Sequence, residues 1–310
     1  MSREEICRNR IISENYRDFI VNQLRGNLFD SISPDELCEQ NMEYLYKAIY
    51  VDGTTADPIN FEKYTYHSVP KCFTLVDTDA LNQSGILQIQ NYPTLRLKGD
   101  GVIIGLIDTG IDYENPIFRN LDGSSRILGI WDQSIQDGTP PQNFLYGTEY
   151  TKEMIDQALR SENPKEIVPT YDENGHGTFL ASVAAGGADV GNQFLGAAPE
   201  SLLAVVKLKP AKRYLKEFYL ISEEIECYQE NDIMLGMRYL NELADRYQLP
   251  LVICVALGSN MGGHNATLPI TGLLEIYANI KNRAVVIGAG NEANQRHHFY
   301  GKSESVNDIK

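Results

Sequence analysis

Unbroken runs of apolar residues recur in the second two-thirds of the chain, separated by stretches with helical spacing. The runs span residues 102–107, 202–208, 250–257 and 284–288. Such runs are typical of strands buried on both faces, as in a parallel sheet that helices cover. Helical patterns lie between and after them, at residues 176–186, 232–247 and 268–282. Because strands and helices alternate, the pattern predicts an α/β sandwich with a mainly parallel sheet.

The N-terminal part of the chain follows a different pattern. We predict two helices there, over residues 13–25 and 34–50, the second opening with Ser-Pro-Asp-Glu, a typical helix start. The stretch 52–70 contains one glycine and two prolines and is predicted to be a connector. These features divide the chain into a small helical N-terminal region, residues 1–70, and an α/β domain, residues 71–310.

Composition and charge exclude several classes of protein. The 310 residues are 43% hydrophobic and 22% charged, which is ordinary for a globular chain. The formal net charge of −15, without a Lys/Arg cluster, argues against a nucleic-acid partner. A membrane span is not expected, because the chain lacks a run of about 18 apolar residues. The N-terminus has no apolar signal core, so we expect a cytoplasmic protein, or one released without a signal peptide.

Cysteine usage gives no sign of a metal site or a disulfide framework. The five cysteines are Cys7, Cys38, Cys72, Cys227 and Cys254. They are odd in number and never spaced as Cys-x-x-Cys, so the pattern favours reduced, mostly buried thiols. The pair His297–His298 lacks the glutamate spacing of a zinc-binding helix, and we expect it on the surface.

Asp108 and His176 are the first candidates for catalytic residues. Asp108 directly follows the run 102–107 and opens an Asp-Thr-Gly turn. His176 lies between Gly175 and Gly177, just before a helix of small residues. An acid at a strand end and an imidazole at a helix start can form the orienting half of a Ser-His-Asp triad.

Asp-Thr-Gly after an apolar strand also occurs in aspartic proteases, where two such carboxylates share one proton. The sequence has no second copy, although a homodimer would supply one. Polar segments also end two other predicted strands, at residues 258–260 and 290–291. Ligands of open α/β sheets bind at the carboxyl ends of the strands, so we predict the site at this edge.

Five motifs occur in one order: Gly105-Leu-Ile-Asp-Thr-Gly-Ile-Asp112, Asn174-Gly-His-Gly-Thr-Phe-Leu-Ala181, Gly196-Ala-Ala-Pro199, Leu257-Gly-Ser-Asn260 and Gly288-Ala-Gly-Asn-Glu292. They resemble the motifs of the subtilisin-like serine proteases (subtilases, peptidase family S8). The stretches 112–120, 130–133, 228–234 and 262–265 resemble the clostridial type most closely. The resemblance covers about residues 85–310 and implies a bacterial protein. It also implies a subtilisin-like three-layer sandwich that hydrolyses peptide bonds.

The resemblance implies a role for each matching residue. Asp108 would be the acid of the triad and His176 the general base, and Asn291 would donate its side-chain amide to the oxyanion. The segment formed by Leu257, Gly258 and Ser259 would be one wall of the substrate cleft. An extended peptide or protein substrate would pair with that wall as an added strand.

Two further expectations follow from the resemblance. We expect the N-terminal region to dock on the catalytic domain as a chaperone or inhibitor. Subtilases often bind calcium, but no Asp-x-Asp-x-Asp-Gly loop is present, so we assign no metal ligands and expect no cofactor.

The serine of the triad has no counterpart in the sequence. Neither Gly-Thr-Ser-x-Ala nor Gly-x-Ser-x-Gly occurs, and neither Ser259 nor Ser303 lies at a strand-to-helix turn. We therefore expect these residues to be the N-terminal part of a subtilase, truncated before the serine-bearing segment and inactive alone. The alternative is a pseudoprotease, a subtilase fold that binds or regulates other proteins.

Overall fold

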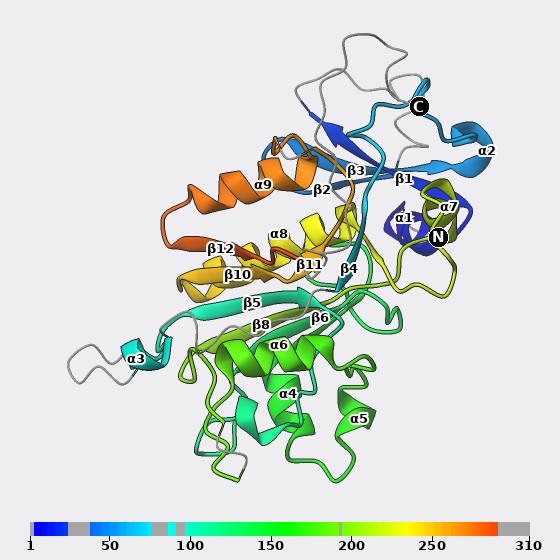
Figure 1. Ribbon diagram of the computed structural model, residues 1–310. Coiled ribbons are helices and arrows are strands. Elements are labelled where there is room, and N and C mark those ends of the chain that lie inside the picture. Colours follow the sequence, from blue (N-terminus) through cyan, green and yellow to red (C-terminus); the bar gives the residue numbers. More distant parts are fainter. Residues whose placement is uncertain are drawn as a thin grey trace.

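The core of the molecule is a six-stranded sheet with strand order β12-β10-β5-β8-β6-β7 (Figure 1). The computed structural model describes residues 3–23, 38–75, 86–90, 97–191, 194–263 and 265–290. The strands are β5 (Ile103–Asp108), β6 (Ile127–Asp132), β7 (Thr148–Thr151), β8 (Leu202–Lys207), β10 (Leu251–Val255) and β12 (Arg283–Ile287). All neighbours are parallel except β6 and β7. The four predicted strands are therefore confirmed as parallel members of one sheet.

Two of the four strands identified from the sequence pattern are buried along nearly their whole length. Every residue of β5 is buried, and in β8 all but the first residue are buried, so both are continuous apolar runs. Strand β6 is equally buried but was not predicted. Strand β7 alternates buried and half-buried residues, as expected of an antiparallel strand at the sheet edge.

Helices cover both faces of this sheet (Figure 1). On one face lie α8 (Glu230–Tyr247) and α9 (Pro269–Ala278), and on the other α4 (Lys152–Ala158), α5 (Pro164–Ile167) and α6 (His176–Ala185). The predicted helices at 176–186, 232–247 and 268–282 are confirmed to within a few residues. The remaining helices are α1 (Arg3–Ile12), α2 (Gly53–Ala56), α3 (Ile86–Gln90), α7 (Arg213–Phe218) and the 3-10 turn η1 (Pro116–Phe118).

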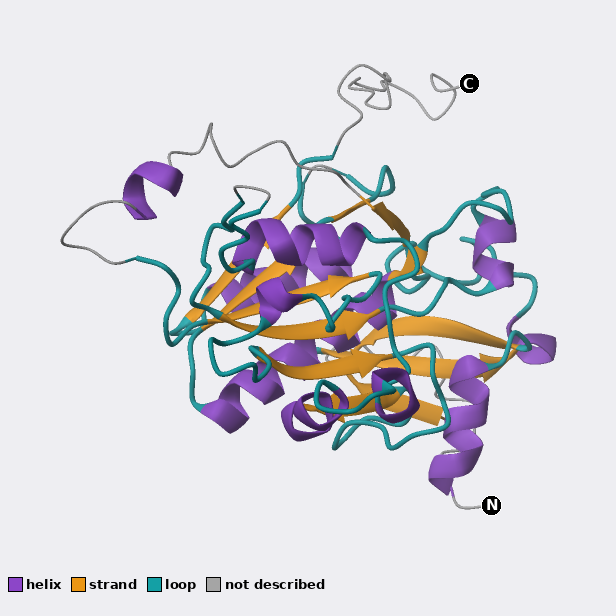
Figure 2. Ribbon diagram, turned by 90° about the horizontal axis from the view of Figure 1, so that it is seen from below, coloured by secondary structure: helices purple, strands orange, loops and turns teal. Residues whose placement is uncertain are grey.

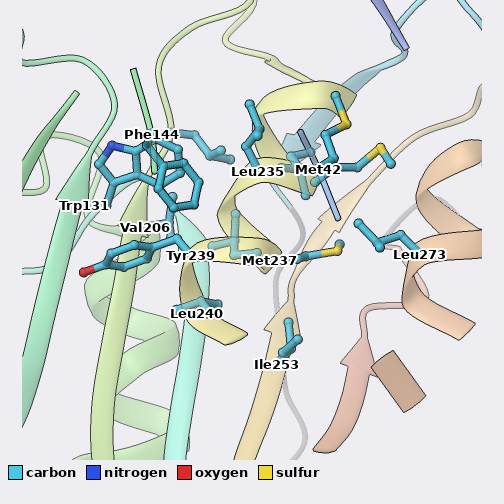
Figure 3. Packing of buried hydrophobic residues seen from close by; sticks show 14 of the residues in the cluster. Met42, Trp131, Phe144, Val206, Leu235, Met237, Tyr239, Leu240, Ile253 and Leu273 are labelled. Atoms are coloured by element: carbon cyan, nitrogen blue, oxygen red, sulfur yellow. The ribbon is translucent and has the colours of Figure 1, made fainter. Parts of the chain in front are cut away.

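Close packing under α8 depends on large and small residues that face each other. Trp131 of β6 contacts Phe144 and Tyr239, with ring centroids 4.7 and 5.6 Å apart (Figure 3). A Cβ atom on Gly129 would lie 2.7 Å from the Tyr239 hydroxyl. The glycine therefore lets α8 approach the sheet, and the aromatic rings fill the remaining space.

The N-terminal region is not the pair of helices that the sequence indicated. The structure has α1, near the N-terminus at the periphery (Figure 2), and then a three-stranded antiparallel sheet of order β1-β3-β2. Strands β1 (Tyr16–Asn22), β2 (Cys38–Asn41) and β3 (Tyr46–Asp52) replace the predicted helices at 13–25 and 34–50. That prediction is wrong.

The error has a physical cause, because both faces of this small sheet are buried. Ile20 and Tyr50 belong to the cluster that also contains the buried side chains of α8. Phe19 and Ile49, their neighbours in the sequence, belong to a second cluster on the opposite face. Burial on both faces removes the alternation of apolar and polar residues that marks a strand, and a short apolar run then resembles a helix.

A third, smaller sheet joins the N-terminal region to the α/β domain. Its middle strand is β4 (Cys72–Leu75), which is antiparallel to both β11 (Leu257–Gly258) and β9 (Tyr228–Gln229). The predicted strand 250–257 therefore divides, its main part entering the large sheet as β10 and its end forming β11. The domain boundary predicted at residue 70 falls shortly before β4 and stays a prediction.

The expectation of free thiols is wrong for two of the five cysteines. Cys7 of α1 and Cys38 of β2 form a disulfide, with Cα atoms 5.4 Å apart. The packing of α1 against β2 brings the two residues together, which their separation of 31 positions does not reveal. Cys72, Cys227 and Cys254 are free.

Two features are absent from the described ranges. No helix among them is both long and apolar enough to cross a membrane. No group of three or more His, Cys, Asp or Glu side chains among them is arranged to hold a metal ion.

Candidate active site

The predicted contact between Asp108 and His176 is present. Asp108 is the last residue of β5 and is 1% exposed, and His176 is the first residue of α6. His176 Nδ1 lies 2.8 Å from Asp108 Oδ1. The same carboxylate oxygen accepts a 2.8 Å hydrogen bond from the backbone N–H of Thr109. The carboxylate is thus fixed at the carboxyl end of the central strand and faces the imidazole.

Glycines allow the helix start to come this close to the strand end. Gly175, the N-cap of α6, has φ +85°, a conformation that L side chains rarely adopt. A Cβ atom on Gly177 would lie 2.2 Å from the carbonyl oxygen of Gly110 and 3.2 Å from Asp108 Oδ1. A side chain at position 177 would therefore push the helix away from the turn that follows Asp108.

Asp172 is a further residue of the candidate site, which was not predicted from the sequence. Its Oδ1 accepts hydrogen bonds from the Thr109 hydroxyl at 2.7 Å and from the Gly175 N–H at 2.9 Å. Its Oδ2 accepts from the backbone N–H of Thr178 at 2.8 Å and from the Thr178 hydroxyl at 2.7 Å. Asp172 therefore links the start of α6 to the loop after β5. An acid shortly before a helix start is a capping signal that could have identified it.

The hydrogen bonds around Asp172 favour its charged form. Burial on its own raises the pKa of Asp172, but the hydrogen bonds from Thr109, Thr178 and Gly175 outweigh it and hold the pKa below its usual value. The Thr109 hydroxyl in turn accepts a 2.9 Å hydrogen bond from the N–H of Gly177. The start of α6, which carries His176, is thus held by a hydrogen-bond network that includes the Asp172 carboxylate.

The nearby thiol of Cys254 is not suited to replace a catalytic serine. Burial raises the pKa of Cys254 to about 11, and the negative charge of Asp108 adds to the effect. The thiol is therefore protonated at neutral pH, whereas a cysteine nucleophile reacts as the thiolate.

A hollow of about 390 Å³ lies next to Thr109 and is bordered by charged side chains. Its lining includes Thr109, Glu173, Lys207, Glu226 and Tyr228. Lys207, at the end of β8, forms a 2.5 Å ion pair with Glu173 and donates to the Tyr171 carbonyl at 2.7 Å. Because Tyr228 belongs to β9, the hollow connects the Asp108 loop with the small β11-β4-β9 sheet.

The predicted cleft wall is the edge of that small sheet. Leu257 and Gly258 form β11, and Ser259 follows it, accepting a 3.1 Å hydrogen bond from the N–H of Met261. Cys254 of β10 pairs with Leu106 of β5, so β11 begins beyond the same end of the main sheet that carries Asp108. The structure thus brings Leu257, Gly258 and Ser259 to the edge that holds the Asp108–His176 pair.

One sequence-based candidate lies outside the described residues. It is Asn291, the expected oxyanion donor, and its role stays a prediction. His297, His298 and Ser303, which were not assigned to the site from the sequence, also lie outside the described residues.

A parallel α/β sandwich with a buried aspartate at a strand end, bonded to a histidine at a helix start, is the architecture of a subtilisin-type protease domain. The model of the subtilase family, peptidase S8, matches residues 99–308. The chain belongs to the subtilase family.

Relatives of known structure or known family support this assignment. The structure of the Clostridium perfringens CspB protease is 30% identical, with a TM-score of 0.56, over 67% of this chain and 40% of that one. The subtilisin-like protease SBT3.6 of Arabidopsis thaliana is 22% identical over 88% of this chain and 37% of its own length. The Arabidopsis protease SBT2.2 is 29% identical over 35% of this chain and 15% of its length. The chain thus spans less than half the length of these relatives.

Proposed function

We propose that the protein is a serine endopeptidase of the subtilisin type, in which Asp108 orients His176 and His176 is the general base. The observation that carries this proposal is the 2.8 Å contact between His176 Nδ1 and Asp108 Oδ1. A carboxylate at Nδ1 requires the hydrogen of the neutral ring to be on that nitrogen, so Nε2 is the nitrogen that can accept a proton. The buried negative charge also stabilises the imidazolium that forms when a serine is deprotonated.

The substrate we propose is an extended segment of peptide or protein. Support comes from β4, a segment of extended chain that already pairs on one side with β11 and on the other with β9. Backbone pairing of this kind is insensitive to side chains, so it suits a site that accepts many sequences. Since β4 and a substrate would use the same two edges, we infer that the N-terminal region inhibits the protease while β4 is bound.

A second candidate is a pseudoprotease that binds peptides without cleaving them. The observation that favours it is the lack of a serine in a nucleophile motif in the 310 residues. Acyl transfer needs such a serine, so the protease proposal concerns a longer protein in which a Gly-Thr-Ser-x-Ala-like motif faces His176, with Asn291 as the oxyanion donor.

A fluorophosphonate probe distinguishes the two candidates, because it labels only an activated serine. We expect no labelling of residues 1–310 and strong labelling of the protein with its native continuation. In the longer protein His176→Ala should lower turnover roughly 10⁴-fold or more. The matched control is His67→Ala, which alters an exposed histidine of the N-terminal region. A longer protein that binds peptides but neither labels nor cleaves would establish the pseudoprotease instead.

A further inference from the structure

Two free cysteines meet where the N-terminal region enters the predicted cleft. Cys72 is the first residue of β4, and Cys227 directly precedes β9. Both are buried, at 4% and 0% exposure, and both belong to one apolar cluster. Cys72 of β4 lies directly opposite Gln229 of β9 in the antiparallel register. Cys227 is two residues before Gln229, so the side chains of Cys227 and Gln229 lie on the same face of the sheet, diagonal neighbours across the strand pair. Each thiol is close enough to the other to shift its pKa.

Backbone contacts hold both cysteines in place. The residue before Cys72, Lys71, donates its N–H to Glu230 Oε2 at 3.1 Å and accepts the N–H of Glu230 at 2.9 Å. The carbonyl of Cys227 accepts a 2.8 Å hydrogen bond from the N–H of Ala211. The contact between the thiols is therefore built into the junction of β4 and β9.

The two thiols differ in acidity. The hydrogen bond donated by the Cys72 S–H lowers the pKa of Cys227; burial opposes this shift, and the charge of Lys216 adds to it. The same hydrogen bond, together with burial, raises the pKa of Cys72. Cys227 is therefore the thiol that becomes a thiolate first, which is the reactive form in thiol–disulfide exchange.

We propose that Cys72 and Cys227 form a reversible disulfide that locks β4 between β11 and β9. The oxidant is a small-molecule disulfide. The Cys227 thiolate attacks one of its sulfur atoms and releases one thiol; the Cys72 thiolate then attacks the Cys227 sulfur of the mixed disulfide and releases the second. Two protein thiols lose two protons and two electrons, and the oxidant is reduced to two thiols.

The disulfide would fix β4 between β11 and β9, so that a substrate peptide could no longer replace it. Strand β4 has four residues and pairs through two of them with each neighbour, so it is expected to open locally more readily than the large sheet. Opening breaks the hydrogen bond from Cys72, but it also relieves the burial of Cys227, and the charge of Lys216 still favours the Cys227 thiolate. The exposed thiolate reacts with the oxidant, and return of β4 brings Cys72 back to complete the bond. With the proposed function as its basis, the inference is that the disulfide makes inhibition by the N-terminal region dependent on redox conditions.

Peptide mapping tests the linkage directly. Trypsin places the five cysteines in five different peptides; Cys72 falls in residues 72–96 and Cys227 in residues 217–238. The folded 1–310 chain is treated with glutathione disulfide, its remaining thiols are alkylated, and it is digested without reductant. We expect peptides 72–96 and 217–238 to be joined, and Cys254 to be alkylated. The Cys7–Cys38 pair serves as the internal reference.

Matched variants and a second readout complete the experiment. Cys72→Ser and Cys227→Ser should each lose the joined peptide, and Cys254→Ser should keep it. Hydrogen exchange of the amides of residues 72–75 should slow tenfold or more in the oxidised wild-type chain and recover after reduction with dithiothreitol.

The proposal is overturned if wild-type Cys72 and Cys227 are both still alkylated after oxidation, or if Cys227 carries only glutathione. This result uses the wild-type chain, so it does not depend on the variants folding. It also needs no protease activity, so an inactive longer protein would contradict the proposed function and leave the linkage result unchanged.

Discussion

At the scale of single residues, the geometry of the Asp108–His176 pair depends on the absence of a side chain at Gly177. We expect Gly177→Ala to lower the free energy of unfolding by about 1–3 kcal/mol, because its Cβ would overlap the Gly110 carbonyl. A decrease in the free energy of unfolding is informative, because alanine is otherwise favoured over glycine within a helix by about 1 kcal/mol. Urea denaturation followed by circular dichroism measures the change.

Gly123→Ala is the control for that experiment. Gly123 has φ +85° but no atom within 4 Å of a Cβ atom built there, so only backbone strain changes. If Gly177→Ala is as stable as the wild type, α6 does not need the close approach to the Asp108 turn.

Asp172 should make stability depend on pH in a defined direction. Its pKa is lower in the folded protein than its usual value of about 3.9. Such a group contributes stability that is fully present above the unfolded pKa and is lost as the pH falls through the folded pKa. We expect Asp172→Asn to destabilise the protein by about 1–3 kcal/mol at pH 7, because the amide cannot accept all the hydrogen bonds that the carboxylate accepts.

The difference between wild type and Asp172→Asn should therefore shrink as the pH is lowered from 5 to about 2.5. Urea denaturation at a series of pH values tests this, with Asp100→Asn as the comparison, since Asp100 is exposed and outside the site. A constant difference across the series would show that Asp172 acts through its shape and not through its charge.

At the scale of elements, buried charges join β1 of the N-terminal sheet to the α/β domain. Asp18 of β1 forms an ion pair with Lys212, and both side chains are at most 3% exposed. Asp18 also accepts hydrogen bonds from Gln229 at 3.0 Å and Asn231 at 3.2 Å. Burial lowers the pKa of Lys212, and the charge of Asp18 opposes that shift. Each charge is therefore tolerated in the interior because the other is present.

Removing one partner should cost far more than removing both. We expect Asp18→Leu to destabilise the chain by about 3–5 kcal/mol, because it leaves the Lys212 ammonium without its partner. The double variant Asp18→Leu/Lys212→Met should recover most of this loss. The free energy of unfolding in urea is the measurement.

Arg213→Ala is the control, because Arg213 and its partner Glu217 are both exposed, and its loss should have little effect. If the double variant is no more stable than Asp18→Leu, the cluster stabilises the junction through its hydrogen bonds and not through charge compensation.

At the scale of the whole molecule, the placement of β4 connects the N-terminal region to the candidate active site. Thr74→Pro removes the backbone N–H in the middle of β4, and proline is poorly accommodated between two neighbouring strands. We expect hydrogen exchange in β9 and β11 to become about tenfold faster, while the strands of the main sheet stay protected. Hydrogen–deuterium exchange with mass spectrometry measures both.

Thr74→Ala, which keeps the N–H, is the matched variant and should exchange as the wild type does. Unchanged protection of β9 and β11 in Thr74→Pro would mean that β4 contributes little to these edges. The inference that β4 blocks the cleft would then fail.

The α/β domain and its acid–base pair could be predicted because their signals are local. Strands β5, β8, β10 and β12 are continuous apolar runs, and parallel order follows once helices alternate with them. Asp108 and His176 each stand at an element end, and the carboxyl ends of parallel strands share one edge. Their meeting therefore follows from the fold class, although 68 positions separate them.

Tertiary structure alone decided the remaining features, because each depends on contacts between distant segments. The N-terminal strands were mistaken for helices since the α/β domain buries both faces of their sheet. Asp172 became part of the site only through its bonds to Thr109 and the start of α6. The Cys7–Cys38 disulfide and the insertion of β4 between β9 and β11 join segments whose sequences show no preference for each other. Local pattern specifies the elements and the ends where chemistry is placed, and long-range packing determines which segments meet there.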